Sequence, residues 1–267
     1  MLNYPMLTVI MPVYNTADYL PRAFDALLNQ EEDNFKLIVV DDGSTDNSAE
    51  VIKKYQSKFR YFKFIQQENQ GPSAARNKAM EFLDTPYFTF HDGDDWTDPG
   101  YTAFFIRAFK KYPQCDLVCC GYYINTEKGK QHAVGTFDAD EITKEEAYLK
   151  MTNVFGSPVK GYSWNKAYRT EIVKANNLQF DPDIALLEDQ IFNVKYTSLA
   201  RSVYFTQTPY YHYLQRKGSI IHQPNLKKVK DNFRGNYRVW QHILKSVSAE
   251  CKEKQAEKKM KLREDRK

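Results

Sequence analysis

The sequence predicts an α/β fold in which helices flank a mostly parallel, twisted sheet. Short apolar runs rich in β-branched or aromatic residues recur at 7–13, 35–40, 62–65 and 87–90, and segments with helical spacing of apolar residues separate them. Such alternation is typical of βαβ units, which build parallel sheets. The run at 87–90 also ends abruptly in carboxylates. It is at the carboxyl ends of strands that open α/β sheets place their ligands.

In the first half of the chain, a predicted strand is followed by a predicted helix three times. The first run leads through a turn into a helix at 19–28. The second run ends in an acidic loop at 41–46, whose hydroxyl residues can cap a helix around 51–55. The third run leads through a Gly-Pro loop at 68–72 into a helix at 73–82.

No GxGxxG pattern follows the first strand, so the dinucleotide-binding fingerprint is absent from this chain.

The second half of the chain is predicted to mix helices, strands and loops in a less regular order. Beyond Pro99 the pattern predicts, in order, a helix at 101–111, a strand at 117–120, an exposed hairpin or loop at 124–140, a helix at 143–151, a mixed aromatic and basic segment at 164–169, a helix from Thr170, a turn at 181–183, a helix opening at 186–192, and strands at 203–205 and 210–214.

A basic amphipathic helix is expected from Leu226 to Val247. Its apolar residues recur every three or four positions on one face, at 229, 233, 237, 240 and 244. From Lys227 onward the chain carries 14 Lys and Arg against 6 Asp and Glu, and its end is expected to be solvated or disordered. This helix could lie on an anionic membrane surface, or pack on the body or a partner subunit. We expect no nucleic-acid binding, because the body is acidic and has no nucleic-acid fold signature.

The composition favours a cytoplasmic protein. The four cysteines form no CxxC pair, and Cys115, Cys119 and Cys120 lie in or beside an apolar run. Buried thiols of this kind are typical of a reducing compartment. No run of about 18 apolar residues is present, so we expect no segment that crosses a membrane.

The acidic turn after the fourth run has two interpretations. Asp92, Asp94 and Asp95 fall within four positions, and like charges packed so closely repel one another. A divalent cation that holds a diphosphate would offset this repulsion, because Mg²⁺ and Mn²⁺ prefer oxygen ligands and share them with substrate phosphates. The alternative is a solvated turn that caps the helix after Pro99.

Five motifs stand in order within residues 5–220, and their order and spacing are more specific than any one of them. The motifs are Val9-Ile10-Met11-Pro12-Val13-Tyr14-Asn15, Val39-Val40-Asp41-Asp42-Gly43-Ser44-Thr45-Asp46, Asn69-Gln70-Gly71-Pro72-Ser73-Ala74-Ala75-Arg76-Asn77, Phe90-His91-Asp92-Gly93-Asp94-Asp95 and Glu188-Asp189-Gln190. Together they resemble family 2 glycosyltransferases with the GT-A fold, of the type that builds bacterial cell-envelope and capsular polysaccharides.

The resemblance implies a Rossmann-like GT-A domain at 1–222, with a nucleotide-sugar half at about 1–98 and an acceptor half at about 99–222. A basic helical extension follows at 223–267. It also implies a metal-dependent enzyme, using Mn²⁺ or Mg²⁺, that moves a sugar from a UDP-sugar to a hydroxyl of a glycan or lipid-linked glycan with inversion. Such an enzyme would work in the cytoplasm, at the inner face of the cell membrane.

The resemblance also implies roles for the donor-side residues. Asp42 would accept the N3–H of the base, beside Pro12, Tyr14 and Asn15. Arg76 and Asn77 would approach a phosphate or the ribose. Asp94 would be the direct metal ligand, and Asp92, with Gly93, would contact the ribose or metal-bound water; Asp95 would hold the loop. Arg216 and Ser219 would close over the diphosphate, unless they form a solvated basic turn.

On the acceptor side, Asp189 would be the general base that takes the proton of the attacking hydroxyl. Glu188 and Gln190 are its neighbours, and Trp164 and Lys166 would face the acceptor; a core tryptophan is the alternative at position 164. His91 stands where an apolar residue is more usual, and we interpret it as a buried histidine.

Two other functions compete with this interpretation. A sugar nucleotidyltransferase would use a similar scaffold, but it would carry a Gly-rich, basic loop where this chain has Pro12-Val13-Tyr14-Asn15. A catalytically silent scaffold subunit would not need the complete acidic set.

Overall fold

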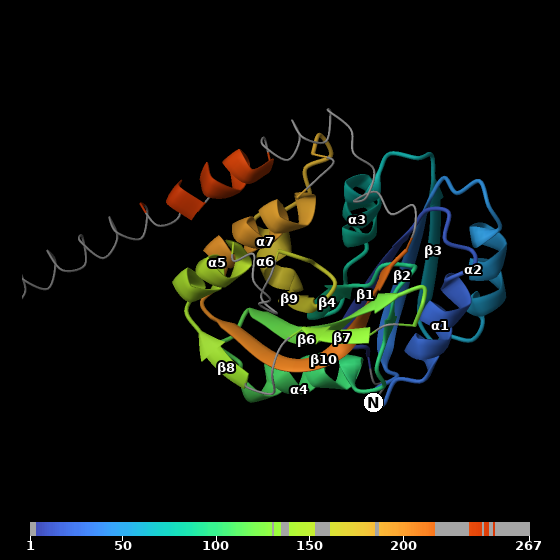
Figure 1. Cartoon of the computed structure of the whole chain (residues 1–267), viewed down its shortest axis with the longest axis horizontal. Helices are drawn as coiled ribbons and strands as arrows, with labels where there is room; N and C mark the ends of the chain where they lie inside the picture. Colours follow the sequence, from blue (N-terminus) through green and yellow to red (C-terminus); the bar gives the residue numbers. More distant parts are fainter. Residues whose placement is uncertain are drawn as a thin grey trace, which may run out of the picture.

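The computed structural model describes residues 4–129, 131–134, 139–152, 161–184, 187–216, 235–241, 243–245 and 248. Helices cover both faces of one sheet (Figure 1). Its first four long strands, β1 (Leu7–Val13), β2 (Phe35–Asp42), β3 (Phe62–Gln67) and β4 (Tyr87–Phe90), all pair in parallel. This half confirms the predicted βαβ units.

Alternation along β1 explains how the sheet separates two hydrophobic clusters. Ile10 points to one face, where α3 (Pro72–Met80) packs, and Val9 and Met11 point to the other, where α1 (Leu20–Leu28) and α2 (Ser48–Gln56) pack. Successive side chains of a strand alternate between faces, so a run that is apolar throughout must be covered on both sides.

The second half of the sheet is mixed rather than parallel. It contains β5 (Trp96–Thr97), β6 (Leu117–Thr126), β7 (Gln131–Val134), β8 (Ala139–Ile142), β9 (Lys166–Arg169) and β10 (Val203–Gln215). Strand β9 lies antiparallel between β4 and β6, whereas β6 and β10 pair in parallel. The full order is β3-β2-β1-β4-β9-β6-β10-β5, with β7 beside β6 and β8 beside β10. The expectation of a mostly parallel sheet therefore holds for the first half only.

Four helices complete the layers: α4 (Tyr101–Lys111), α5 (Lys144–Thr152), α6 (Thr170–Ala175) and α7 (Glu188–Leu199). Helix α4 packs on the face of α1, and the other three pack on the face of α3. The segment predicted as an exposed hairpin or loop at 124–140 contains the end of β6, all of β7 and the start of β8.

One bent strand replaces the two strands predicted at 203–205 and 210–214. The pairing of β10 with β6 shifts register around Pro209, which lies opposite Gly121. Proline cannot donate a ladder hydrogen bond, and an ideal Cβ on Gly121 would lie 2.1 Å from the carbonyl oxygen of Gln207. The bend carries the end of β10 back to the acidic turn after β4.

The C-terminal extension carries a second apolar face, which the sequence prediction did not identify. Residues 235–241 and 243–245 are helical. Their buried side chains are Val239 and Ile243, which belong to the same hydrophobic cluster as the buried side chains of α7. The face predicted to be apolar points to solvent: Tyr237, Trp240 and Leu244 are 65%, 53% and 65% exposed. Both faces carry apolar residues, so helical spacing alone could not decide which one packs. The predicted boundary at 222 and the apolar positions 229 and 233 lie outside the described residues.

Within the described part of the chain, no helix combines the length and the apolar character needed to cross a bilayer.

Candidate active site

The loops that follow β1 and β2 are held together at one edge of the sheet. Asn15, whose φ is 50°, accepts a hydrogen bond from the backbone N–H of Thr45 at 2.8 Å. Its own N–H donates to Ser44 Oγ at 3.0 Å. Next to it, Tyr14 is 46% exposed, and Pro12 lies opposite Val40 in the sheet. The predicted base-binding residues therefore do share one corner, in which Asn15 holds the two loops in place.

Asp42 ends β2 and fixes the loop before α3. Its Oδ1 accepts hydrogen bonds from Gln67 Nε2 at 2.7 Å and from the N–H of Gln70 at 2.9 Å, and its Oδ2 accepts from the N–H of Gly71 at 2.7 Å. A carboxylate offers about four acceptor positions, so one position on Oδ2 remains for a further donor. An ideal Cβ on Gly43 would lie 2.7 Å from the backbone nitrogen of Asn69, so glycine permits the close approach of the two loops.

Asp95 is the structural member of the acidic turn. It is fully buried, its Oδ1 accepts the N–H of Leu214 at 2.8 Å, and its Oδ2 accepts the Tyr211 hydroxyl at 2.7 Å. Burial, together with the nearby charges of Asp94 and Asp92, raises its pKa well above the usual range. The same Tyr211 oxygen accepts the N–H of Asp92 at 3.0 Å, so β10 holds the turn at two points.

His91 is buried beside this turn as a neutral ring. Its Nδ1 lies 2.9 Å from the carbonyl oxygen of Asp92, which assigns the proton to Nδ1, and its edge packs against Tyr211. Burial lowers its pKa to about 4. Nε2 is buried with no partner among the described residues. His91 therefore supports the turn and is neutral at physiological pH, as a buried histidine was expected to be.

Asp92 and Asp94 are the partly accessible carboxylates of the turn. Their side chains are 26% and 20% exposed, and Asp94 Oδ2 forms a 2.7 Å ion pair with Arg216 Nε. Gly93 between them packs tightly: an ideal Cβ there would lie 3.0 Å from Thr16 Oγ1.

These two carboxylates fit a cation that is shared with a substrate. In the part of the chain that the structure describes, no three His, Cys, Asp or Glu side chains gather into a complete metal site. Mg²⁺-type sites usually take one or two carboxylates and complete their shell with phosphate and water oxygens. Asp94 already attracts a positive group, the Arg216 guanidinium, to the position where such a cation would be needed.

A single buried cation joins the turn to α7. Arg76 of α3 is 5% exposed; its Nη2 lies 3.4 Å from Asp92 Oδ1, and its Nη1 lies 3.2 Å from both Glu188 Oε1 and Asp189 Oδ1. The resemblance predicted that Arg76 would approach a phosphate or the ribose. The structure instead places it between the predicted donor-side carboxylate and the predicted base.

This cluster perturbs the ionisation of its members. Burial lowers the pKa of Arg76, but Asp189, Asp92 and Glu188 together raise it beyond its ordinary value, so the guanidinium stays charged. Burial raises the pKa of Asp92 to about 6, against the opposing charge of Arg76. Burial and the charge of Asp189 raise the pKa of Glu188 to about 7. Strongly perturbed carboxyls in one cleft are typical of functional sites.

Asp189 lies in the first turn of α7, after Leu187, whose φ is 69°. Its Oδ2 accepts hydrogen bonds from the N–H of Ser163 at 3.2 Å and from Ser163 Oγ at 3.0 Å. Its Oδ1 is buried, and it accepts no hydrogen bond from the described residues. Sequence analysis identified Asp189 but not Ser163, because the partners are 26 positions apart.

Four other predicted residues have tasks inside the protein. The Asn77 amide makes two hydrogen bonds with the backbone of Phe180, of 2.9 and 2.8 Å. Trp164 is 3% exposed and stacks on Tyr211 at 4.5 Å. Lys166 is fully buried, its Nζ donates to the carbonyl oxygen of Tyr162 at 2.6 Å, and burial lowers its pKa. Gln190 donates to the carbonyl oxygen of Met151 at 3.3 Å.

The prediction that Trp164 and Lys166 contact an acceptor sugar is therefore wrong, because neither side chain reaches the surface. The core alternative holds for Trp164. Ser219 lies outside the described residues. Arg216, the other residue predicted to close over the diphosphate, pairs with Asp94.

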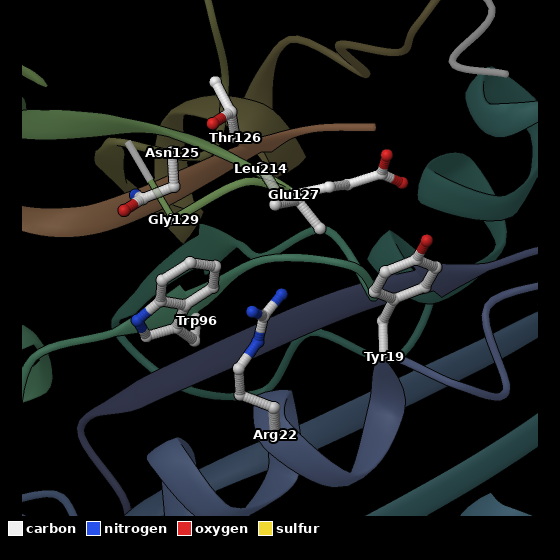
Figure 2. A pocket seen from close by; sticks show the side chains of 8 residues that line it. All are labelled: Tyr19, Arg22, Trp96, Asn125, Thr126, Glu127, Gly129 and Leu214. Carbon is white, nitrogen blue, oxygen red and sulfur yellow. The ribbon is translucent and has the colours of Figure 1, made fainter. Parts of the chain in front are cut away.

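An open cavity of about 570 Å³, which the sequence does not reveal, lies beside the acidic turn. Figure 2 shows Arg22 from α1 reaching into it next to Trp96 of β5, with Glu127 above. The Arg22 guanidinium lies 3.6 Å from the centre of the Trp96 ring, and its Nη2 donates to the backbone carbonyl of Asp94 at 3.0 Å. The remaining lining residues are Tyr19, Asn125, Thr126, Gly129 and Leu214.

The Arg76 cluster makes stability depend on pH. Arg76→Met removes the charge that lies between the carboxyls, so the pKa of Asp92 and of Glu188 rises further in the folded state. The unfolded state has released these protons above about pH 4, so the free energy of unfolding then falls as pH rises. We expect Arg76→Met to lose about 3–5 kcal/mol at pH 8 and clearly less at pH 5, measured by urea denaturation.

Arg76→Lys is the matched control, because it keeps the positive charge. It should lose less stability than Arg76→Met at pH 8. Equal losses for Arg76→Met at both pH values would contradict the electrostatic role of this cluster.

Known proteins are similar to this chain over most of its length. Residues 8–176 match the family model described as Glycosyl transferase family 2. The chain is 36% identical over 225 residues to EpsH of Bacillus subtilis (strain 168), which carries a provisional glycosyltransferase name; the match covers 81% of this chain and 63% of EpsH. It is 32% identical over 220 residues to glycosyltransferase GlyA of Streptococcus pneumoniae serotype 4, covering 80% of this chain and 31% of GlyA.

A solved structure shares the fold. TarS of S. aureus in complex with UDP superposes with a TM-score of 0.71 at 25% identity, covering 89% of this chain and 65% of that chain. The same protein has been solved with UDP-GlcNAc, with a TM-score of 0.67 at 25% identity over 82% of this chain and 61% of that one. The chain thus spans under two thirds of EpsH and about a third of GlyA. With its GT-A fold and its match over 8–176, the chain belongs to glycosyltransferase family 2.

Proposed function

We propose that this chain transfers a sugar from a UDP-sugar to a hydroxyl of a glycan or lipid-linked glycan, with inversion, in cell-surface polysaccharide synthesis. The observation that carries the proposal is the Arg76 cluster. It brings Asp92 of the donor-side turn and Asp189 of α7 to within 3.4 Å and 3.2 Å of one guanidinium. The candidate donor-side carboxylate and the candidate base therefore both lie against the same guanidinium.

The corner at the ends of β1 and β2 is proposed to hold the base. Asp42 keeps one acceptor position on Oδ2, which suits the N3–H of uracil, and the exposed Tyr14 ring offers a surface for stacking. The UDP complexes of TarS, which has the same fold, support this choice of nucleotide.

Asp94, with Asp92, is proposed to hold Mn²⁺ or Mg²⁺ together with the diphosphate. A bound divalent cation would stabilise the charge that develops on the leaving diphosphate. The Arg216 guanidinium now paired with Asp94 would then be free to contact a phosphate oxygen.

The chemical step is proposed to be a direct displacement. Asp189 takes the proton of the acceptor hydroxyl as its oxygen attacks C1 of the donor sugar. The C1–O bond to the diphosphate breaks, and the bonding electrons leave with the diphosphate. Attack from the opposite face inverts C1, so one carboxylate is sufficient as base and no covalent sugar intermediate is needed.

The acceptor side needs a different surface from the one predicted, because Trp164 and Lys166 are buried. The cavity lined by Arg22, Trp96 and Glu127 opens beside Asp94 and offers both hydrogen-bond donors and acceptors. We assign the units of the acceptor that lie beyond its reacting sugar to this cavity.

We also propose that the C-terminal helix rests on an anionic membrane, the inner face of the cell membrane. Val239 and Ile243 anchor the helix to the body, and Arg238 pairs with Asp181. The opposite face presents Tyr237, Trp240 and Leu244 to solvent. Aromatic rings beside Lys-rich sequence are typical of helices that lie in the membrane interface.

Donor and metal are expected to stabilise the protein together. UDP with Mn²⁺ at about 100 times their dissociation constants should add about 2.7 kcal/mol and raise Tm by about 5–10 °C, more than the sum of the separate shifts. Differential scanning fluorimetry measures this. In Asp94→Asn the synergy should disappear while any shift from UDP alone remains. Undiminished synergy in that variant would contradict the assignment of Asp94.

Removal of the base should abolish chemistry but not binding. In a panel of UDP-glucose, UDP-galactose and UDP-GlcNAc, Asp189→Asn should lower the rate of sugar release by about 10²–10⁴-fold with UDP affinity unchanged. Glu188→Gln, the neighbouring amide substitution, should lose less. Asp189→Asn turning over at the wild-type rate would show that the base lies elsewhere.

The membrane proposal predicts selective binding to anionic vesicles. The full-length protein should sediment with vesicles that contain phosphatidylglycerol and not with pure phosphatidylcholine vesicles. Trp240→Asp should weaken the sedimentation, whereas Leu28→Asp, at an exposed leucine on α1, should not. Equal binding of wild type and Trp240→Asp would exclude this helix face.

A further inference from the structure

The segment 161–165 lies against the start of α7 and contacts the candidate base directly. Ser163 is fully buried, and both its backbone N–H and its hydroxyl point at the same oxygen, Asp189 Oδ2, at 3.2 and 3.0 Å. A buried hydroxyl and an adjacent N–H on one carboxylate oxygen form a rigid, charge-assisted pair.

The segment is locked to the same helix one turn further on. Asn193 Nδ2 donates to the carbonyl oxygens of Gly161 at 2.8 Å and Tyr162 at 3.2 Å, and Asn193 Oδ1 accepts the Tyr168 hydroxyl at 2.7 Å. An ideal Cβ on Gly161 would lie 2.7 Å from the side chain of Gln190, so only glycine permits this approach. Loop and helix therefore form one unit around the carboxylate.

The two oxygens of Asp189 have different surroundings. Oδ2 is held by Ser163, whereas Oδ1 accepts no hydrogen bond from the described residues and lies 3.2 Å from Arg76 Nη1. We propose that Ser163 is a positioning residue for Asp189, which fixes Oδ2 so that Oδ1 is the oxygen that takes the acceptor proton. This inference rests on the proposed role of Asp189 as the base.

Ser163→Ala removes one of the two hydrogen bonds on Asp189 Oδ2 and keeps the one from the backbone N–H. The other titratable groups around Asp189 come from α3, the turn after β4, α7, β9 and the segment before it. They are Arg76, Asp92, Glu188, Lys166, Tyr168 and Tyr162. Ser163→Ala leaves all of them in place.

The test is Ser163→Ala in the full-length protein, assayed by UDP-sugar hydrolysis with the best donor from the panel. The turnover rate should fall about 10-fold, the loss of one hydrogen bond to a charged group. The KM for the UDP-sugar should stay within about twofold, so that the loss lies in the turnover rate. The affinity for UDP with Mn²⁺ should stay within about twofold, because the donor site is untouched.

Two further variants separate positioning from folding. Ser163→Thr keeps the hydroxyl and should restore most of the rate. Ser198→Ala, whose hydroxyl donates within α7 to the carbonyl oxygen of Lys195, should behave as wild type.

The outcomes distinguish this inference from the proposed function. If Asp189→Asn is inactive but Ser163→Ala keeps the wild-type rate, Ser163 does not position the base and the proposed function stands. A loss of UDP affinity in proportion to the loss of rate would likewise overturn the positioning role. Full activity of Asp189→Asn would overturn both.

Discussion

The buried guanidinium of Arg76 is the interaction on which the site depends. Burying one cation among the carboxylates of Asp92, Glu188 and Asp189 costs desolvation energy that only close pairing can offset. The arrangement fixes three elements relative to one another: α3, the turn after β4 and the first turn of α7. It still leaves more negative than positive charge in the cluster. That excess is consistent with the proposed binding of a diphosphate together with its cation.

Hydrogen bonding separates structural carboxylates from functional ones. Asp95 has both oxygens bonded inside the protein, and Asp42 keeps a single free acceptor position. Asp94 pairs with a side chain that a cation can replace, and Asp189 keeps one oxygen without a hydrogen-bond donor among the described residues. We therefore propose that the same residue type serves as a structural anchor, a metal ligand or a base, depending on how many of its acceptor positions the fold already uses.

The sequence predicted the first half of the fold well, because alternating apolar runs and the acidic loops are local signals. Strand β9 does not stand out in the sequence, because the four residues from Lys166 to Arg169 show no polar–apolar alternation. The buried lysine depends on acceptors that the fold supplies, the carbonyl oxygen of Tyr162 and the side-chain oxygen of Asn165. The partners of Arg76 and Ser163 come from distant positions, so no spacing rule could find them. Residue type alone leaves two possibilities for Trp164, a contact with a sugar or a place in the core. Its stacking on Tyr211 of β10 shows that it belongs to the core. Likewise, the C-terminal helix has apolar residues on two faces, so their spacing does not show which face packs on the body.

We propose that the turn after β4 binds a metal diphosphate, with Asp189 on the other side of the Arg76 cluster. A crystal structure of the protein with UDP and Mn²⁺ would test this proposal. We expect the ion on a carboxylate oxygen of Asp94, with Arg216 moved off Asp94 and the uracil against Asp42. We also expect Asp189 to accept the hydrogen bonds of Ser163 as before. A diphosphate bound away from Asp94, with the Arg216 pair intact, would show that this turn does not hold the metal diphosphate.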